Sequence, residues 1–573
     1  LKLISSNQII DEVTQPVSFS SKTISDDGVY LNGNLIKIIG TTYYSYDLKY
    51  KNLISYKKLV DDLTLIKNTG FNSVRFAKHL PHPYALEICR ELGLLAFIEL
   101  PINSLTDELC TDELFFKKAK EYFLGFIENY SKYSSVFAIG LGSSYLPDSE
   151  EQITFINELA KILKENLNIF SYASFVSFPE IVISDLDLYG VEIYSKPIDE
   201  IREELKRSIE TFGKAKIFLS EVTYPNYNGS TSGYENPFSL EAQAKYLSNI
   251  FLISEEKLLH SFFINTMFQY KGDYPSLYTG YNQDGRYQIS IISKQHGLNT
   301  IAYKFVKSKL TSGDQVTIPI GNNEKEAPLF FILVGLLLLV LTALLINSKR
   351  KFREDVSRSF LKPYNFFSDV RDHRIFAGIH LFFLLLLLSA SAALLFENIL
   401  FYFRSNILFD KLLLSFGSNT LIDVIGYLAW NPEIGFLILF GTIVISIILL
   451  SIIVHIFSFF IKTKILFSSI FFVIVWALVP LSLLIPIELI LYRVLIENII
   501  NVYIFIFLGI YFIWIIQRII KGIYIIFDVR PVFVYLISFL LFIITFGGIF
   551  IYFHLTESTI YFVINAIKQY SFL

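Results

Sequence analysis

Six long apolar segments in the C-terminal part of the chain constrain its fold more than any other feature. The first, residues 328–347, contains no charged side chain. A run of about 20 apolar residues matches the thickness of the hydrocarbon core of a bilayer. Because a soluble core could not bury so many long apolar helices, the sequence predicts an all-α polytopic membrane domain over 328–573. The other candidate spans lie near 376–396, 434–458, 465–487, 499–516 and 531–553.

Lys and Arg residues in the short connections predict the orientation of this membrane domain. Cytoplasmic loops of membrane proteins are enriched in these residues. The connection after the first span is the most basic one, and the connections after the third and fifth spans repeat the bias with Lys462, Lys464, Arg518, Lys521 and Arg530. The alternate connections hold only Arg404, Lys411 and Arg493. We therefore expect an integral membrane protein whose residues 1–327 and C-terminus lie outside the cytoplasm, in a periplasm or at the cell surface.

Residues 29–310 alternate between short apolar runs and helical periods. Helices are expected at Tyr56–Asn68, Pro83–Leu92, Asp112–Tyr130 and Glu150–Asn166. Eight strands alternating with helices over about 280 residues is the usual size of a TIM barrel, (β/α)8. A doubly wound open sheet is the alternative fold, but the chain lacks the Gly-rich first turn of that fold. The expected strands end near Thr41, Arg75, Glu99, Gly142, Ser177, Tyr194, Glu221 and Gln269.

The run from Phe71 to Pro101 places Arg75 and His79 after the second strand and Glu99 at the end of the third. Charged and imidazole groups at the C-terminal ends of consecutive barrel strands are typical of a ligand site. This run and the closing Asp284-Gly285-Arg286 resemble glycoside hydrolase family 2, which includes β-galactosidases and β-glucuronidases. The resemblance covers about residues 20–310. It implies a catalytic barrel that binds glycans, with no cofactor and no metal.

The same resemblance implies the neighbouring domains. An immunoglobulin-like β-sandwich precedes the barrel in that family, so residues 1–28 look like the end of such a domain. Residues 311–327 form a polar linker to the membrane domain. Within that domain, Phe360–Arg371 and Ile519–Arg530 resemble the Yip family of polytopic membrane proteins, which implies a helical bundle and little about chemistry.

The two carboxyl groups of a retaining glycosidase carry its chemistry, and they lie about 5–5.5 Å apart. The resemblance implies that Glu221, at the end of the seventh strand, is the nucleophile. The acid/base position after the fourth strand reads Ser143-Ser144 instead of Asn-Glu. A serine hydroxyl cannot deliver a proton at neutral pH, and general acid catalysis contributes about 10²–10⁴-fold. Hydrolysis is therefore expected to be weakened or lost, unless Glu192 or Glu99 supplies the proton.

The resemblance also implies a set of sugar contacts. Phe268 or Tyr270 replaces the tryptophan that stacks on sugar at the eighth strand, because aromatic faces suit sugar C–H surfaces. A bland alternative is that Glu221 forms a structural salt bridge and that Arg75 only ties loops together. The expected substrate-binding residues are Arg75, His79, Glu99, Ser143, Tyr194, Phe268 and Tyr270.

Three functions remain open from the sequence. The barrel is a degenerate glycosidase that binds glycans, an active glycosidase with an unusual proton donor, or a docking domain of a transport or assembly protein. A net charge of -3 gives no reason to expect a nucleic-acid partner, and Cys89 and Cys110 do not have the spacing of a metal site. Glu488 lies near a predicted membrane boundary, where a solvated interfacial charge is the simpler reading and an ion path the alternative.

Overall fold

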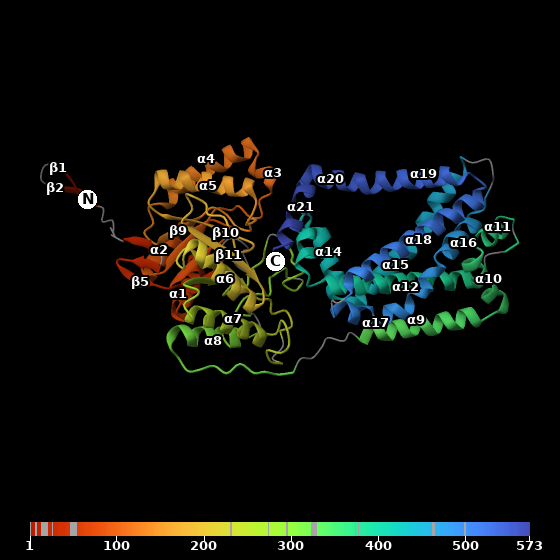
Figure 1. Ribbon diagram of the computed structural model, residues 1–573, viewed down its shortest axis with the longest axis horizontal. Helices are drawn as coiled ribbons and strands as arrows, with labels where there is room; N and C mark the ends of the chain where they lie inside the picture. The colour runs from red at the N-terminus through yellow and green to blue at the C-terminus, as the bar shows by residue number, and fades with distance from the viewer. Residues whose placement is uncertain are drawn as a thin grey trace. The chain divides into compact units, whose positions relative to one another are not determined.

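The computed structural model describes residues 2–572 apart from 6–7, 13–20, 26, 46–53, 230–231, 273, 283, 294–295, 323–328, 373, 376–377, 461–464 and 498–499. Predictions for 13–20, for the linker end at 323–327, and for Lys462 and Lys464 therefore lie outside the described residues. The chain divides into two units, shown in Figure 1. Unit 1 comprises Leu1–Gly272, Arg286–Glu324 and Ile564–Leu573, and unit 2 comprises 273–285 and 325–563.

Unit 1 contains a closed barrel of eight parallel strands, which confirms the predicted TIM-like fold. Each strand pairs with the next, and β13 pairs with β6 to close the ring. The eighth strand ends at Ile264 rather than near Gln269, so that boundary was predicted five residues too late. The strands are β6 (Ile38–Thr42), β7 (Ser73–Phe76), β8 (Leu95–Glu99), β9 (Val136–Gly140), β10 (Phe170–Phe175), β11 (Leu188–Tyr194), β12 (Ile217–Thr223) and β13 (Ser261–Ile264).

The barrel helices begin and end where local capping chemistry predicts. Ser55 caps α1 by accepting from the backbone N–H of Lys58, and Gly70 ends that helix in the left-handed conformation. Pro83 occupies the first turn of α2, where its missing N–H costs nothing. The helices are α1 (Tyr56–Thr69), α2 (Pro83–Leu92), α3 (Asp107–Cys110), α4 (Glu113–Tyr130), α5 (Glu150–Asn166), α6 (Ile198–Phe212), α7 (Leu240–Glu255) and α8 (Ile301–Thr311).

Short antiparallel strands precede the barrel. β1 (Lys2–Ser5) pairs with β2 (Gln8–Glu12), and β4 (Gly28–Leu31) lies between β3 (Lys22–Ser25) and β5 (Asn34–Ile36). Asn32 and Gly33 form the two-residue hairpin turn between β4 and β5, with the positive φ of 52° and 78° that such a turn requires. The three-stranded sheet runs across residue 28, so the assignment of 1–28 to a separate sandwich domain stays a prediction.

Unit 2 is a bundle of apolar helices (Figure 1). Five described helices are long and apolar enough to cross a membrane, and a sixth span exists if the bent pair Phe467–Leu483 and Ile485–Ile496 counts as one. This number agrees with the predicted six. The elements are α9 (Leu329–Asn347), α10 (Arg350–Leu361), α11 (Pro363–Arg371), α12 (Ile379–Phe403), α13 (Ile407–Leu414), α14 (Asn419–Trp430), α15 (Pro432–Ser458), α16 (Phe467–Ala477), η1 (Val479–Leu483), α17 (Ile485–Ile496), α18 (Asn501–Phe527), α19 (Pro531–Phe542), η2 (Ile543–Gly547) and α20 (Gly548–Glu557). The last helix, α21 (Thr559–Tyr570), begins in unit 2 and belongs to unit 1 from Ile564 on.

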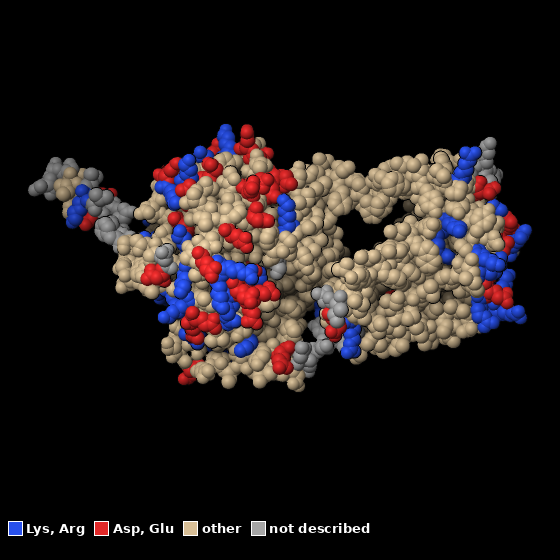
Figure 2. All heavy atoms as spheres, viewed as in Figure 1, with Lys and Arg blue, Asp and Glu red and all other residues tan. Residues whose placement is uncertain are grey.

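The surface of unit 2 is strongly patterned. Large apolar side chains stay exposed along its long helices, for example Leu333, Ile510 and Val532. Basic side chains gather at the end of the bundle that carries α10 and α11, beside a stretch almost without charge (Figure 2). An exposed apolar surface this extensive is typical of contact with lipid rather than with water.

Candidate functional site

The floor of the candidate site is an ion pair inside the mouth of the barrel. Arg75, at the end of β7, is fully buried. Its Nη2 and Nε donate to Glu99 Oε2 at 2.7 and 3.2 Å, and its Nη1 donates to Glu221 Oε1 at 2.8 Å. A guanidinium suits this position because its planar fork reaches two carboxylates from one buried place. Arg75 therefore has no exposed surface for a direct sugar contact, and this geometry favours its role as an organiser of the carboxylates.

Glu99 is likewise held away from solvent. Besides Arg75, it accepts from the Tyr172 hydroxyl at 3.1 Å and from the backbone N–H of Lys78 at 3.2 Å. The absence of a side chain at Gly140 makes this packing possible, because a Cβ there would lie 2.8 Å from Glu99 Cγ. With both oxygens occupied and no exposed surface, Glu99 acts as the counter-ion of Arg75 rather than as a proton donor.

Glu221 lies at the centre of the site, near the end of β12. Lys78 Nζ is 3.3 Å from its Oε1, and Asn265 Nδ2 donates to its Oε2 at 3.3 Å. Burial raises the pKa of Glu221, but the positive charges of Lys78 and Arg75, with their hydrogen bonds, outweigh burial and lower it to about 2. The Glu221 carboxyl is therefore ionised across the physiological pH range, as a nucleophile must be.

Ser144 and Glu192, which are far apart in sequence, are in direct contact. The backbone N–H of Ser144 donates to Glu192 Oε1 at 2.9 Å, and its Oγ donates to Glu192 Oε2 at 2.8 Å. Ser144 has a φ of 57°, a left-handed conformation that is uncommon for residues other than glycine and is often found at functional sites. The carboxyl that the sequence lacks at position 144 is thus present beside it, supplied by β11.

The two carboxyls in the site are joined by one phenol. Tyr194 Oη lies 3.1 Å from Glu192 Oε2 and 3.2 Å from Glu221 Oε2. These two oxygens can lie no farther apart than the sum of those distances, so the two carboxyls are neighbours in the site. Glu192 and Glu221 are also directly opposite each other in the β11–β12 register.

The surroundings shift the pKa values of the two carboxyls in opposite directions. Burial raises the pKa of Glu192, the charge of Lys78 opposes this, and the negative charge of Glu221 raises it further. A single phenol O–H can donate to only one carboxyl. We infer that Tyr194 donates to ionised Glu221 and that a protonated Glu192 donates to the phenol oxygen. Two carboxyls with opposed pKa shifts are the arrangement expected of an acid and a nucleophile.

Aromatic side chains line the same end of the barrel. Tyr44 stacks on Tyr270, with ring centroids 3.8 Å apart, and on His79 at 5.7 Å. The Nδ1 of His79 is 2.8 Å from the carbonyl oxygen of Ala77, while Nε2 is buried and has no partner among the described residues. Burial lowers the pKa of His79, so the ring is neutral and Nε2 can accept a hydrogen bond from a ligand.

Two predicted contacts lie elsewhere. Phe268 packs edge-to-face on Tyr43 and lies under Lys58 Nζ, on the side of α1, so the structure does not bring it into the cluster. Ser143 is fully buried, and its Oγ donates to Asn103 Oδ1 at 3.3 Å, which ties two loops together. Phe268 and Ser143 are therefore packing and loop residues in this geometry.

Sequence reasoning did not identify Lys78 and Asn265. Lys78 lies in the same loop as Arg75 and His79, so its position in that loop was the available signal. Asn265 was missed because the eighth strand ends earlier than predicted. A third feature is the C-terminal segment of unit 1, in which Gln569 Nε2 donates to the carbonyl oxygen of Ser144 at 2.7 Å and Lys568 Nζ lies 2.7 Å from Asp107 Oδ2.

Comparisons with known proteins relate part of the chain to glycoside hydrolases. No family model matches the sequence. A β-galactosidase of Psychromonas ingrahamii is 28% identical over 110 residues, which are 18% of this chain and 11% of that protein. A β-glucuronidase of Bacteroides fragilis is 22% identical over 161 residues, which are 27% of this chain and 23% of the relative. A putative β-glucuronidase of Formosa agariphila is 34% identical over 100 residues, or 17% and 12% of the two chains. The matched segments thus span less than a quarter of these relatives.

Solved structures include a GH2 β-galacturonidase from Eisenbergiella tayi bound to galacturonate. Its TM-score to this chain is 0.47 with 18% sequence identity, and the aligned part covers 52% of this chain and 55% of the β-galacturonidase chain. An FMN-binding β-glucuronidase from Faecalibacterium prausnitzii gives a TM-score of 0.47 with 19% identity, covering 54% and 50% of the two chains. These comparisons do not bear on the helical bundle, so its resemblance to the Yip family stays a prediction.

Proposed function

We propose that the barrel binds glycans at its strand-end face and hydrolyses β-glycosidic bonds slowly, with Glu221 as nucleophile and Glu192 as proton donor. The observation that carries this proposal is the joining of the two carboxyls by Tyr194 and the contact between Glu192 and Ser144. The sequence similarity to β-galactosidases and β-glucuronidases supports it.

The proposed reaction has two steps. The Glu221 carboxylate attacks the anomeric carbon, while Glu192 gives its proton to the departing glycosidic oxygen. The Glu192 carboxylate then takes a proton from water, and the resulting hydroxide displaces Glu221 from the sugar. This sequence retains the anomeric configuration, in agreement with the short distance between the two carboxyls.

The same contacts explain why the reaction should be slow. Arg75 and Lys78 neutralise much of the negative charge of Glu221 in the resting site, so part of its nucleophilicity is lost until substrate displaces a partner. Glu192 donates its proton to Tyr194 and accepts two hydrogen bonds from Ser144, and both carboxyls are about 1% exposed. Substrate must therefore open the hydrogen-bond network around the two carboxyls before proton transfer, which costs free energy.

Replacing Glu192 by Gln tests the proton donor. Hydrolysis of a glycoside with an alkyl leaving group should fall by about 10²–10⁴-fold, because that oxygen needs protonation. With an activated aryl glycoside, the second step should become limiting, and added azide should restore turnover and yield a glycosyl azide. In the unmodified protein, kcat/KM should fall as pH rises through the raised pKa of Glu192, and the Gln variant should lose this alkaline limb.

Glu241→Gln is the matched control, because Glu241 is equally buried but lies on α7, outside the cluster. It should leave the pH profile unchanged. Equal losses on aryl and alkyl substrates for Glu192→Gln, without azide rescue, would contradict the donor assignment.

Binding without hydrolysis is the second candidate function, and the serine at position 144 favours it. It predicts that the unmodified protein binds oligosaccharides yet leaves aryl β-glycosides intact. A barrel that serves only as a docking domain predicts neither binding nor hydrolysis. One assay of cleavage, combined with one of sugar binding, therefore separates the three functions that the sequence leaves open.

We also propose that the bundle anchors the protein in a membrane, with the barrel outside the cytoplasm. The proposal rests on the five or six apolar helices and on the basic residues around α10 and α11. In a background without Cys89 and Cys110, a Gln315→Cys variant in intact cells should react with a membrane-impermeant maleimide. An Arg353→Cys variant should react only after the cells are permeabilised, because the basic loops are expected on the cytoplasmic side. Both positions are exposed in the protein itself, so burial would not explain a difference between them. The opposite pattern would move the barrel to the cytoplasm.

A further inference from the structure

A second polar cluster lies inside the helical bundle, where α12 meets the bent span. Ser391 Oγ is 2.8 Å from Glu488 Oε1 and 3.2 Å from the carbonyl oxygen of Leu481. Ser391 and Glu488 have no exposed surface. Glu488 is therefore a buried residue of the bundle, and its interpretation as a solvated interfacial charge was wrong.

The cluster coincides with a break in a span. Phe467–Leu483 and Ile485–Ile496 meet at an angle of 51°, and Leu481 lies in the 3-10 turn just before the break. The Leu481 carbonyl accepts from the backbone N–H of Leu484 at 2.9 Å and has a second lone pair to offer. Irregular backbone at membrane depth is tolerated where it is buried in protein or lines a cavity, and broken helices often bind ions in transporters.

One oxygen of the Glu488 carboxyl has no hydrogen-bond partner among the described residues. Glu488 Oε2 has no hydrogen bond with any described residue, and no described cation pairs with this carboxyl. An ionised carboxylate is poorly tolerated in an apolar interior unless a positive charge accompanies it. Glu488 must therefore carry either a bound proton or a small cation.

A second buried carboxyl, Glu397, lies on α12, the helix that also carries Ser391. Glu397 has no exposed surface, and neither of its oxygens has a partner among the described residues. Gly435 of α15 makes room for it, since a Cβ there would approach Glu397 Oε2 to 2.5 Å. The neighbouring Asn398 donates to the Leu394 carbonyl at 2.8 Å but leaves its own Oδ1 without a partner.

The helices around α12 provide little compensating charge. The described residues of α9, α16 and η1 include no titratable acid or base. None of the titratable groups on α12 itself or on the other packed helices hydrogen-bonds or ion-pairs with either carboxyl among the described residues. Those groups are His380 and Tyr402 of α12, Arg404 directly after it, Asp423 and Tyr427 of α14, Glu433 and His455 of α15, and Tyr492 and Arg493 of α17.

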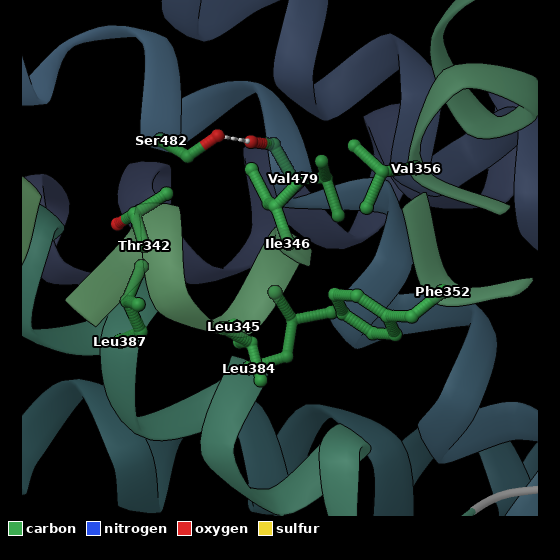
Figure 3. A pocket seen from close by; sticks show the side chains of 9 residues that line it. All are labelled: Thr342, Leu345, Ile346, Phe352, Val356, Leu384, Leu387, Val479 and Ser482. Carbon is green, nitrogen blue, oxygen red and sulfur yellow. Dashed lines mark hydrogen bonds between the residues drawn. The ribbon is translucent and has the colours of Figure 1, made fainter. Parts of the chain in front are cut away.

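The surroundings of the break are apolar. A small pocket adjoins η1 and is lined by side chains of α9, α10, α12 and η1 (Figure 3). Its two hydroxyls are already satisfied, because Thr342 donates to the Leu338 carbonyl and Ser482 to that of Val479, each at 2.7 Å. Such surroundings are unfavourable to a hydrated metal ion, and a proton needs no hydration shell.

We propose that Glu488, with Ser391 and the Leu481 carbonyl, forms a proton-binding site at the break of the span, and that Glu397 is a second proton-binding carboxyl on α12. This proposal is independent of the function of the barrel. It assigns to the bundle a site for proton uptake within the membrane, in addition to a role as an anchor.

The test uses the full-length protein in phospholipid vesicles treated with dicyclohexylcarbodiimide, an apolar reagent that adds to protonated carboxyls. Mass spectrometry should find adducts at Glu488 and Glu397 and none at Glu354, an exposed carboxylate of α10 that serves as the control. Above the pH at which the two groups titrate, the rate of modification should fall about tenfold per pH unit. Replacing choline chloride by sodium chloride should leave both rates unchanged.

Three outcomes would overturn the proposal. Absence of adducts at both buried positions would mean that the carboxyls are ionised or otherwise engaged. Modification of Glu354 as fast as that of Glu488 would remove the distinction on which the assignment rests. Protection by sodium chloride would assign the site to a sodium ion instead of a proton. Because the measurement is made on the unmodified chain, it does not depend on a variant that folds poorly.

Discussion

Replacing Glu221 by Gln is expected to lower the hydrolysis of an activated aryl β-glycoside by about 10⁴-fold or more, because no other group can form the covalent intermediate. An aryl leaving group needs little acid assistance, so this substrate reports on the nucleophile alone. The site should keep its shape, since the amide oxygen can still accept from Arg75. The new amide nitrogen would face Asn265, whose Oδ1 has no partner among the described residues and can accept from it after the Asn265 amide rotates. Rates are measured by release of the chromophore, with sugar affinity measured in parallel.

Glu241→Gln is again the matched control and should retain the full rate. A mechanism-based covalent inhibitor should label Glu221 in the unmodified protein and leave the Glu221→Gln variant unlabelled. If the variant hydrolysed the aryl glycoside as fast as the unmodified chain, Glu221 would be a structural residue. The structural salt bridge to Arg75 would then be its whole role.

Replacing Arg75 by Ala should destabilise the barrel by about 3 to 5 kcal/mol, because it leaves Glu99 and Glu221 buried next to each other without their shared cation. The sequence analysis names Arg75 as an expected substrate-binding residue, and in that role its loss would mainly weaken sugar binding. The full burial of Arg75 leads to the opposite expectation. The change in the free energy of unfolding is measured by chemical denaturation, with the loss of secondary structure followed by far-UV circular dichroism.

Arg90→Ala, at an exposed position of α2, should leave the unfolding midpoint almost unchanged. The destabilisation caused by Arg75→Ala should shrink in strong acid, as Glu221 takes up a proton and no longer needs the cation. A stable Arg75→Ala variant with reduced sugar affinity would instead support the direct contact that the sequence suggested.

The sequence by itself determined the order of the secondary structure. Strand and helix periods gave the eight-stranded barrel, and segment length with apolar content gave the positions of the spans, because both signals are local and repeat along the chain. The helices at Pro83–Leu92 and Glu150–Asn166 were predicted to the residue, since Pro83 and Ser149 mark their starts chemically.

Only the tertiary structure decided the chemistry. From the sequence, Ser144 indicates that the acid/base carboxyl is missing, and the substitution Ser144→Glu would be expected to restore it. Closure of the barrel brings Glu192 from β11 to Ser144, so a carboxyl introduced there would face a carboxyl already present. Contacts between the ends of non-adjacent strands depend on barrel closure and side-chain length, which leave no periodic trace in the sequence. The burial of Arg75 and Glu488 could not be predicted for the same reason. A charged residue at a strand end or in a helix gives the same sequence pattern whether the fold buries it or exposes it.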